Sequence, residues 1–132
     1  MKLDGIFSSS SLLHGDLGKS PEELLLRLRN FETALNASAI VAITDRHGTI
    51  TYVNDKFCEI SKYPREELLG QTHRVINSGY HSKEFFREMW TTISQGNIWR
   101  GDIRNRARDG SFYWLNATIT PVLGQDGTPE HY

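Results

Sequence analysis

A change in hydrophobic period near residue 40 narrows the possible folds of this chain more than any other pattern. Before residue 40, one apolar stripe has helical spacing and consists of Leu24, Leu28, Phe31 and Leu35. Steps of four, three and four residues are typical of one face of an α-helix. Beyond residue 40, apolar and polar residues alternate with a period of two, as in strands that bury one face. Both periods in one chain predict an α+β fold.

The segment around Ser20 carries the signals of a helix start. Ser20 is a preferred N-cap residue, Pro21 follows at the first helical position, and Glu23 lies three residues after the cap. We therefore expect an amphipathic N-terminal helix over residues 20–37, preceded by a flexible segment over residues 1–19 that is rich in Gly and Ser. Because two heptads are too short for a stable isolated coiled coil, the stripe packs either on its own domain or on a second copy.

Residues 38–132 predict one domain with strands at both ends and helices between them. The strands are expected over 40–44, 49–53, 97–106, 111–122 and the start of a fifth at 129–132. Asn54 and Ser82 are expected helix caps, and Asp109-Gly110 is a typical hairpin turn. We expect a five-stranded antiparallel sheet with helices on one face. Its last strand is truncated, which suggests a piece of a longer protein.

Composition excludes several classes of function. With 15 Lys and Arg, 16 Asp and Glu and a net charge of −1, the chain lacks the basic field that nucleic acids and anionic lipids require. Cys58 is the only cysteine, which excludes an intrachain disulfide and favours a reducing, cytoplasmic setting. No apolar run approaches the roughly 20 residues of a membrane helix.

The sequence also lacks the usual motifs of catalysis and metal binding. It contains no Gly-rich phosphate-binding loop, no pair of histidines four residues apart and no nucleophile elbow. The five histidines are scattered along the chain. We therefore expect neither an enzyme nor a metal site.

Two residues have a polarity that does not match the strand face they occupy. Asn105 shares a face with Trp99 and Ile103, whereas the alternate positions of the strand form a charged, solvated row. A buried amide without partners costs roughly 1–3 kcal/mol, so Asn105 has either a structural partner or a polar ligand. Trp114 lies on the outer face of the next strand, which suggests that the N-terminal helix covers it, in the same chain or in a neighbour.

Small residues on the inner face suggest a cavity. Gly101 and Ala117 leave room above the sheet, and Trp90, Trp99 and Tyr113 are positioned to wall that room. Such a cavity, with a few amides, suits a flat heteroaromatic ligand. A well-packed aromatic core has the same composition, so periodicity leaves both alternatives open.

Two stretches resemble the PAS family of sensory domains. They are ITDRHGTITYVNDKFCEISKYPREELLGQ and NSGYHSKEFFREMWTTISQGNIWRGDIRNRARDGSFYWLNATITPVLGQDG, within residues 39–132. The first resembles the strand-turn-strand opening of the family. The second resembles its long helix and its two long strands. The resemblance implies a PAS-like fold for residues 38–132.

Within the family, the chain resembles the flavin-binding sensors of the aerotaxis-receptor and nitrogen-fixation redox-sensor type. The shared features are Trp90 near the end of the long helix, the Trp-x-Gly of residues 99–101, Asn105-Arg106, and Asn54 after the second strand. The resemblance implies that Trp90 flanks the isoalloxazine, that Asn105 hydrogen-bonds its polar edge and that Asn54 lines the pocket. With Trp99 and Tyr113, these residues form the expected cofactor-binding set.

The resemblance implies FAD as the cofactor, with two alternatives. Sensors of this type carry an Arg-His-Pro stretch before the long helix, where this chain has Asn-Ser-Gly at residues 77–79, and this departure puts FAD in question. Haem is a less favoured alternative, because His81 lies close to the position of the haem ligand in haem-binding PAS domains. The second alternative is no cofactor. Light-driven adduct chemistry is not expected, because residues 70–79 contain no cysteine.

The resemblance also implies a function in signal transduction. We expect a sensor in which a flavin changes state, hydrogen bonds at Asn105 change, and the N-terminal helix or a C-terminal linker passes the change to an effector domain. The effector would be a histidine kinase, a cyclic-di-GMP enzyme or a chemoreceptor. A homodimer through the N-terminal helix and the outer sheet face is the expected assembly. The alternative is a ligand-free module for dimerisation and signal relay.

Overall fold

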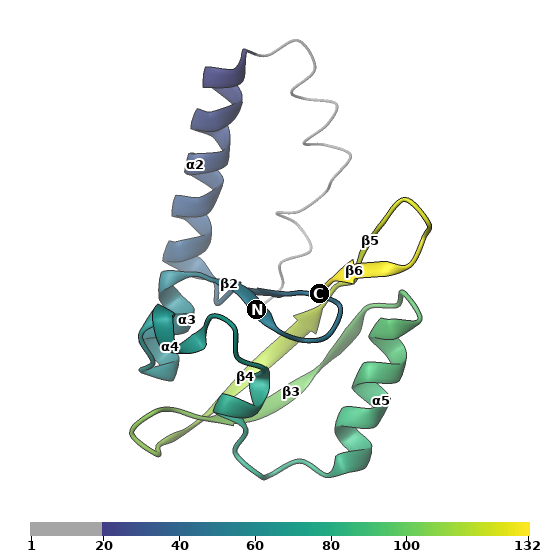
Figure 1. The fold of residues 1–132 in the computed structure, drawn as a ribbon. Coiled ribbons are helices and arrows are strands. Elements are labelled where there is room, and N and C mark those ends of the chain that lie inside the picture. The colour runs from purple at the N-terminus through teal and green to yellow at the C-terminus, as the bar shows by residue number, and fades with distance from the viewer. Residues whose placement is uncertain (1–19) are drawn as a thin grey trace.

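The computed structural model describes residues 20–132, and Figure 1 shows their arrangement. The flexible segment predicted over residues 1–19 lies outside the described residues. The elements are α2 (Pro21–Ser38), β1 (Ala42–Thr44), β2 (Ile50–Val53), α3 (Asp55–Ser61), α4 (Arg65–Leu68), the 3-10 helix η1 (His73–Ile76), α5 (Lys83–Ser94), β3 (Trp99–Arg106), β4 (Phe112–Ile119), β5 (Val122–Leu123) and β6 (Pro129–His131). Their order matches the predicted order.

Helix α2 begins as the sequence predicts. The Glu23 N–H donates to Ser20 Oγ (3.2 Å), and the Ser20 N–H donates to Glu23 Oε2 (3.3 Å), which completes a capping box. The helix projects from the rest of the molecule, and its C-terminal end lies near β2 and α3 (Figure 1). The predicted stripe is therefore buried only at that end, since Leu35 is buried whereas Leu28 is 56% exposed.

The strands form three two-stranded antiparallel ladders, β1–β2, β3–β4 and β5–β6. Residues 44 and 132 connect two of these ladders: the Thr44 N–H donates to the Tyr132 oxygen (2.8 Å) and the Tyr132 N–H to the Thr44 oxygen (3.1 Å). The antiparallel α+β class is confirmed, whereas the single strand predicted over 111–122 is wrong. It divides into β4 and β5 at Pro121, which has no N–H to donate to a ladder.

The main core lies under the β1–β2 hairpin. Its members are Ile50, Val53, Phe57, Leu68 and Ile76, none more than 4% exposed. They come from β2, α3, α4 and η1. Helix α5 contributes Met89 and Ile93, which are buried and four residues apart, so they lie on one face of that helix.

The tip of the β3–β4 hairpin is fastened to α3 and α4. Lys62 Nζ lies 2.6 Å from Asp109 Oδ2, and Arg108 Nη2 lies 2.9 Å from Glu67 Oε1. The Arg108 N–H also donates to the Ser61 oxygen at 2.9 Å. The hydrogen bond from Lys62 is the main cause that holds the pKa of the Asp109 carboxyl well below its usual range. These contacts set the position of the hairpin relative to the main core.

The outer face of β4 carries an exposed aromatic group. Trp114 is 54% exposed, and its ring contacts the rings of Tyr80 at 5.2 Å and His81 at 6.0 Å. Helix α2 of the same chain packs on α3 instead. Within residues 20–132, this helix therefore does not provide the cover that we expected, which leaves a neighbouring copy as the alternative.

Candidate functional site

The inner face of the β3–β4 hairpin is the candidate ligand site. The register pairs Trp99 with Ile119, Gly101 with Ala117, Ile103 with Leu115 and Asn105 with Tyr113. Asn105 is buried at 9% exposure, whereas the other seven residues of this face are only half-buried. The alternation predicted from the sequence is confirmed. An apolar face that the chain covers incompletely, with one buried amide at its end, is a surface on which a ligand can lie.

Asn105 and Tyr113 are partners across the ladder. The Asn105 amide is hydrogen-bonded to the phenol oxygen of Tyr113. Burial raises the pKa of Tyr113 to about 12, and the bond from Asn105 opposes that rise. The phenol is therefore neutral near pH 7. This bond gives Asn105 a structural partner, and an amide can form further hydrogen bonds, so the pair can also face a ligand.

Trp99 occupies the space predicted above Gly101. A Cβ atom at Gly101 would lie 2.7 Å from the Trp99 ring, so only glycine lets the ring lie there. Phe85 of α5 meets Trp99 edge to face at 5.5 Å between ring centroids. The expectation of open room at Gly101 is therefore wrong, because residues two apart on a strand share a face and the large ring covers its smaller neighbour. Trp99 forms a wall between the inner face and α5.

Trp90 lies at the opposite end of α5, against the β1–β2 turn. Its ring is so close to Gly48 that a Cβ atom there would lie 2.9 Å from it, and Gly48 has a φ of +86°. Tyr132 meets the ring edge to face at 5.6 Å. The residue is 39% exposed. Trp90 thus joins α5 to the β1–β2 turn and to residue 132.

Asn54 is almost completely buried and binds three backbone groups. Its Oδ1 accepts from the N–H groups of Val41 and Phe57, both at 3.0 Å, and its Nδ2 donates to the Ala39 oxygen at 2.7 Å. The side chain therefore caps α3 and ties it to the segment between α2 and β1. The structure places Asn54 at this joint, and Asn105 in the inner face of the hairpin.

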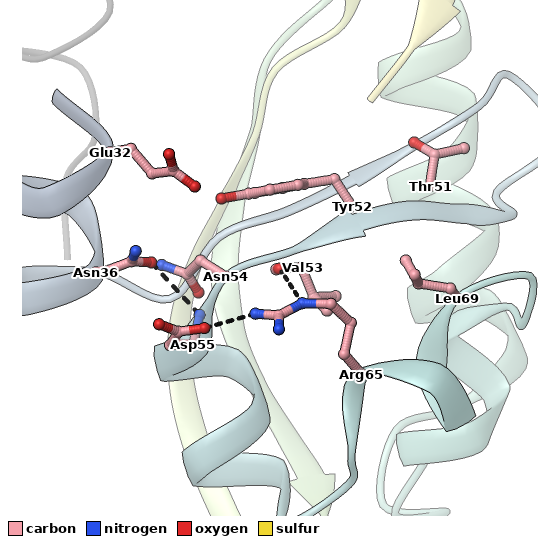
Figure 2. A pocket seen from close by; sticks show the side chains of 9 residues that line it. All are labelled: Glu32, Asn36, Thr51, Tyr52, Val53, Asn54, Asp55, Arg65 and Leu69. Atoms are coloured by element: carbon pink, nitrogen blue, oxygen red, sulfur yellow. Dashed lines mark hydrogen bonds and ion pairs between the residues drawn. The ribbon is translucent and has the colours of Figure 1, made fainter. Parts of the chain in front are cut away.

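A cavity of about 270 Å³ lies between α2, β2, α3 and α4 and was missed by sequence reasoning (Figure 2). It is lined by Glu32, Asn36, Thr51, Tyr52, Val53, Asn54, Asp55, Arg65 and Leu69. Glu32 and Asn36 are four residues apart on α2, and this spacing is the one sequence signal that they share a face.

The polar groups of this cavity bind one another. Arg65 Nη2 lies 2.6 Å from Asp55 Oδ1, and Arg65 Nε donates to the Val53 oxygen at 3.2 Å (Figure 2). Burial, with the charge of Glu32 as the next cause, raises the pKa of the Tyr52 phenol. Asn36 Oδ1 accepts from the Asp55 N–H at 3.4 Å. We interpret the cavity as the polar joint through which α2 meets the domain.

The described residues bear on two further features, a cluster of metal-ligating side chains and a helix able to span a membrane. Within 20–132, no three His, Cys, Asp or Glu side chains gather in a way that would hold a metal ion. Over the same range, no helix is both long and apolar enough to cross a membrane. Burial raises the pKa of the Cys58 thiol, which disfavours the reactive thiolate.

Known proteins resemble this chain in sequence and in fold. A nitrogen fixation regulatory protein of Klebsiella pneumoniae is 40% identical over 102 residues, which is 77% of this chain and 21% of that protein. The aerotaxis receptor of Escherichia coli strain K12 is 34% identical over 86 residues, 65% of this chain and 17% of that protein. The chain thus spans about a fifth of the length of these curated relatives.

The fold agrees with a solved structure. An RNA-binding light-oxygen-voltage receptor superposes with a TM-score of 0.73 at 24% sequence identity, covering 87% of this chain and 33% of that one. This likeness concerns the fold alone. Residues 28–132, most of the chain, match the sequence profile of the PAS fold. The chain therefore belongs to the PAS family.

Proposed function

We propose that this chain is the sensory PAS module of a larger bacterial signalling protein and that it binds a flavin on the inner face of the β3–β4 hairpin. The observation that carries the proposal is the half-buried apolar face that ends in the buried Asn105. A flat ring system fits such a face, because it covers apolar surface and can use the amide at its polar edge. The similarity to two curated sensory and regulatory proteins supports the same function.

The residues of this face have the chemistry that an isoalloxazine needs. Trp99 offers an aromatic wall, and Asn105 with Tyr113 offers an amide and a neutral phenol for hydrogen bonds. A bound flavin would supply reversible redox chemistry, and these residues would orient the ring and sense its hydrogen-bonding state. FAD is the form that we propose. Asn54, at the N-cap of α3, and Trp90, beside the β1–β2 turn, would also contact the ligand.

We propose that this sensor has no catalytic activity, lies in the cytoplasm and binds no nucleic acid. It passes its signal to an effector domain of the parent protein. The assembly we propose is a homodimer through α2 and the outer sheet face. Its support is a set of exposed side chains: Leu25 and Leu28 on α2, and Phe112 and Trp114 on β4, each at least 50% exposed. These same side chains support the alternative function, a ligand-free module for dimerisation and relay.

An absorption spectrum of the protein purified without added cofactor tests the proposal. We expect a yellow protein that bleaches with dithionite and releases a flavin that mass spectrometry identifies. Asn105→Ala should lose at least tenfold in flavin occupancy, because the ring would lose a hydrogen bond in a buried site. Asn116→Ala is the matched control, since Asn116 is an amide on the outer face of β4. Colourless protein with no retained ligand would favour the relay module instead.

A further inference from the structure

Residues 77–82, here called the β3 loop, connect η1 to α5 and run along the edge of β3 that β4 leaves open. Asn77 forms an isolated antiparallel bridge with Asn105. Ser78 Oγ donates to the Arg104 oxygen, and the Arg104 N–H donates to His81 Nε2 at 2.9 Å. Both backbone polar groups of Arg104 thus bind side chains of the β3 loop. Such groups on an edge strand would otherwise face solvent.

His81 stands in an aromatic cluster. The rings that contact it are Tyr80 at 5.0 Å, Phe85 at 4.0 Å, Phe86 at 5.8 Å and Trp114 at 6.0 Å. Among the residues that contact His81 or its bonded partner, Tyr80 carries a phenol and Arg104 a guanidinium, which lies 5.7 Å from the Tyr80 ring. The ring contacts from α5 and β4 are with phenylalanine and tryptophan, which carry no charge.

The contact with Arg104 requires one particular form of the imidazole. Nε2 accepts a hydrogen bond, so in the neutral ring the proton is on Nδ1. Protonation would place an N–H on Nε2, directly facing the N–H of Arg104, and two donors cannot share a hydrogen bond. The neutral ring therefore closes the contact and the charged ring opens it.

We propose that neutral His81 holds the β3 loop on β3 through its bond to Arg104, that protonation of His81 releases the loop, and that this contact positions Asn105. We call this contact the clip. The next residue after Arg104 is Asn105, whose backbone bridges to Asn77 in the same loop. Loss of the hydrogen bond at Arg104 removes a constraint on β3 next to Asn105, whose side-chain amide lies on the inner face. The clip rests on this geometry alone. Its effect on a bound flavin rests also on the proposed function.

Nuclear magnetic resonance of the intact chain labelled with 15N tests the clip without any ligand. At pH 8, long-range proton–nitrogen spectra should show the His81 proton on Nδ1. Between pH 8 and 5, the Arg104 amide resonance should shift with the same midpoint as the His81 ring. The exposed His47 and His131 serve as internal references whose titration leaves the Arg104 amide unmoved. A proton on Nε2 at pH 8, or an Arg104 amide that does not follow His81, would overturn the clip.

Two variants separate the clip from a packing role. His81→Gln supplies a carbonyl oxygen that does not titrate, so the Arg104 amide should stay bonded at both pH values. His81→Phe keeps a ring against Phe85 but has no acceptor, so the contact should be open at both. If both variants keep the wild-type pH response, the assignment to His81 is wrong.

Flavin retention at pH 8 and pH 5 tests the positioning of Asn105. We expect the wild type to lose flavin several-fold more readily at pH 5, and His81→Gln to lose this pH dependence. If the Arg104 contact opens at pH 5 but the wild type retains flavin equally at both pH values, the positioning role is overturned. If no flavin is retained at either pH, the proposed function fails, and the spectra of the ligand-free chain still decide the clip.

Discussion

Asn105 and Tyr113 show how much a single polar residue in an alternating pattern can reveal. The period of two places Asn105 among apolar neighbours, and the cost of an unpaired amide requires a partner there. The structure supplies that partner directly across the ladder. Sequence reasoning left the partner open between protein and ligand, because periodicity determines the face of a residue but not which side chain on the neighbouring strand meets it.

Tyr113→Phe tests this pair. The variant removes the phenol oxygen and leaves the Asn105 amide without that partner, so we expect a loss of about 1 kcal/mol in the free energy of unfolding at pH 7, measured by urea titration. Because burial raises the pKa of Tyr113 to about 12, above about 10 in the unfolded chain, the unfolded state releases the proton first. Wild-type stability should therefore fall as pH rises from about 10 to 12.

The phenylalanine variant should show a shallower fall over the same interval. Tyr80→Phe is the matched control, because Tyr80 is 60% exposed and its change should leave the slope near that of the wild type. Equal slopes for wild type and Tyr113→Phe would contradict the assignment of this titration to Tyr113.

At the scale of elements, the helix starts and turns could be predicted, and the position of a large side chain within a strand could not. The capping box at Ser20 and the cap at Asn54 are local, so the residues that form them are adjacent in sequence. The break at Pro121 is local too, and the pattern of alternation concealed it. The position of Trp99 over Gly101 depends on a side-chain rotamer, which hydrophobic period does not determine.

Helix α2 carries the element-scale prediction, which concerns the proposed dimer. Leu28 belongs to the predicted stripe and is 56% exposed, so Leu28→Glu should leave the monomer folded and raise the dimer dissociation constant at least tenfold. Sedimentation over a range of concentrations measures this. Leu26→Glu is the control, since Leu26 is 60% exposed but lies about 200° around the helix from Leu28. A dimer unaffected by Leu28→Glu would exclude this face as the interface.

Over the whole molecule, burial is distributed unevenly. The main core lies between the β1–β2 hairpin and helices α3, α4 and η1, and every member is nearly inaccessible. The inner face of the β3–β4 hairpin is only half-buried, although β3 and β4 form the longest strand pair of the described residues. Composition and resemblance predicted a hollow on this side of the sheet. They did not predict the polar cavity at α2, because its lining comes from four elements whose contact is a tertiary property.

This uneven burial predicts that the stability of the domain depends on its ligand. A compound that binds the folded state alone stabilises it by about 2.7 kcal/mol at a concentration 100 times its dissociation constant. If the half-buried face is a flavin site, added FAD should raise the urea midpoint of the ligand-free domain in proportion to the logarithm of its concentration. Asn105→Ala should flatten this dependence, whereas Asn116→Ala, on the outer face of β4, should leave it unchanged. A midpoint independent of FAD in the wild type would mean that this face does not bind the flavin, and it would favour the ligand-free relay module.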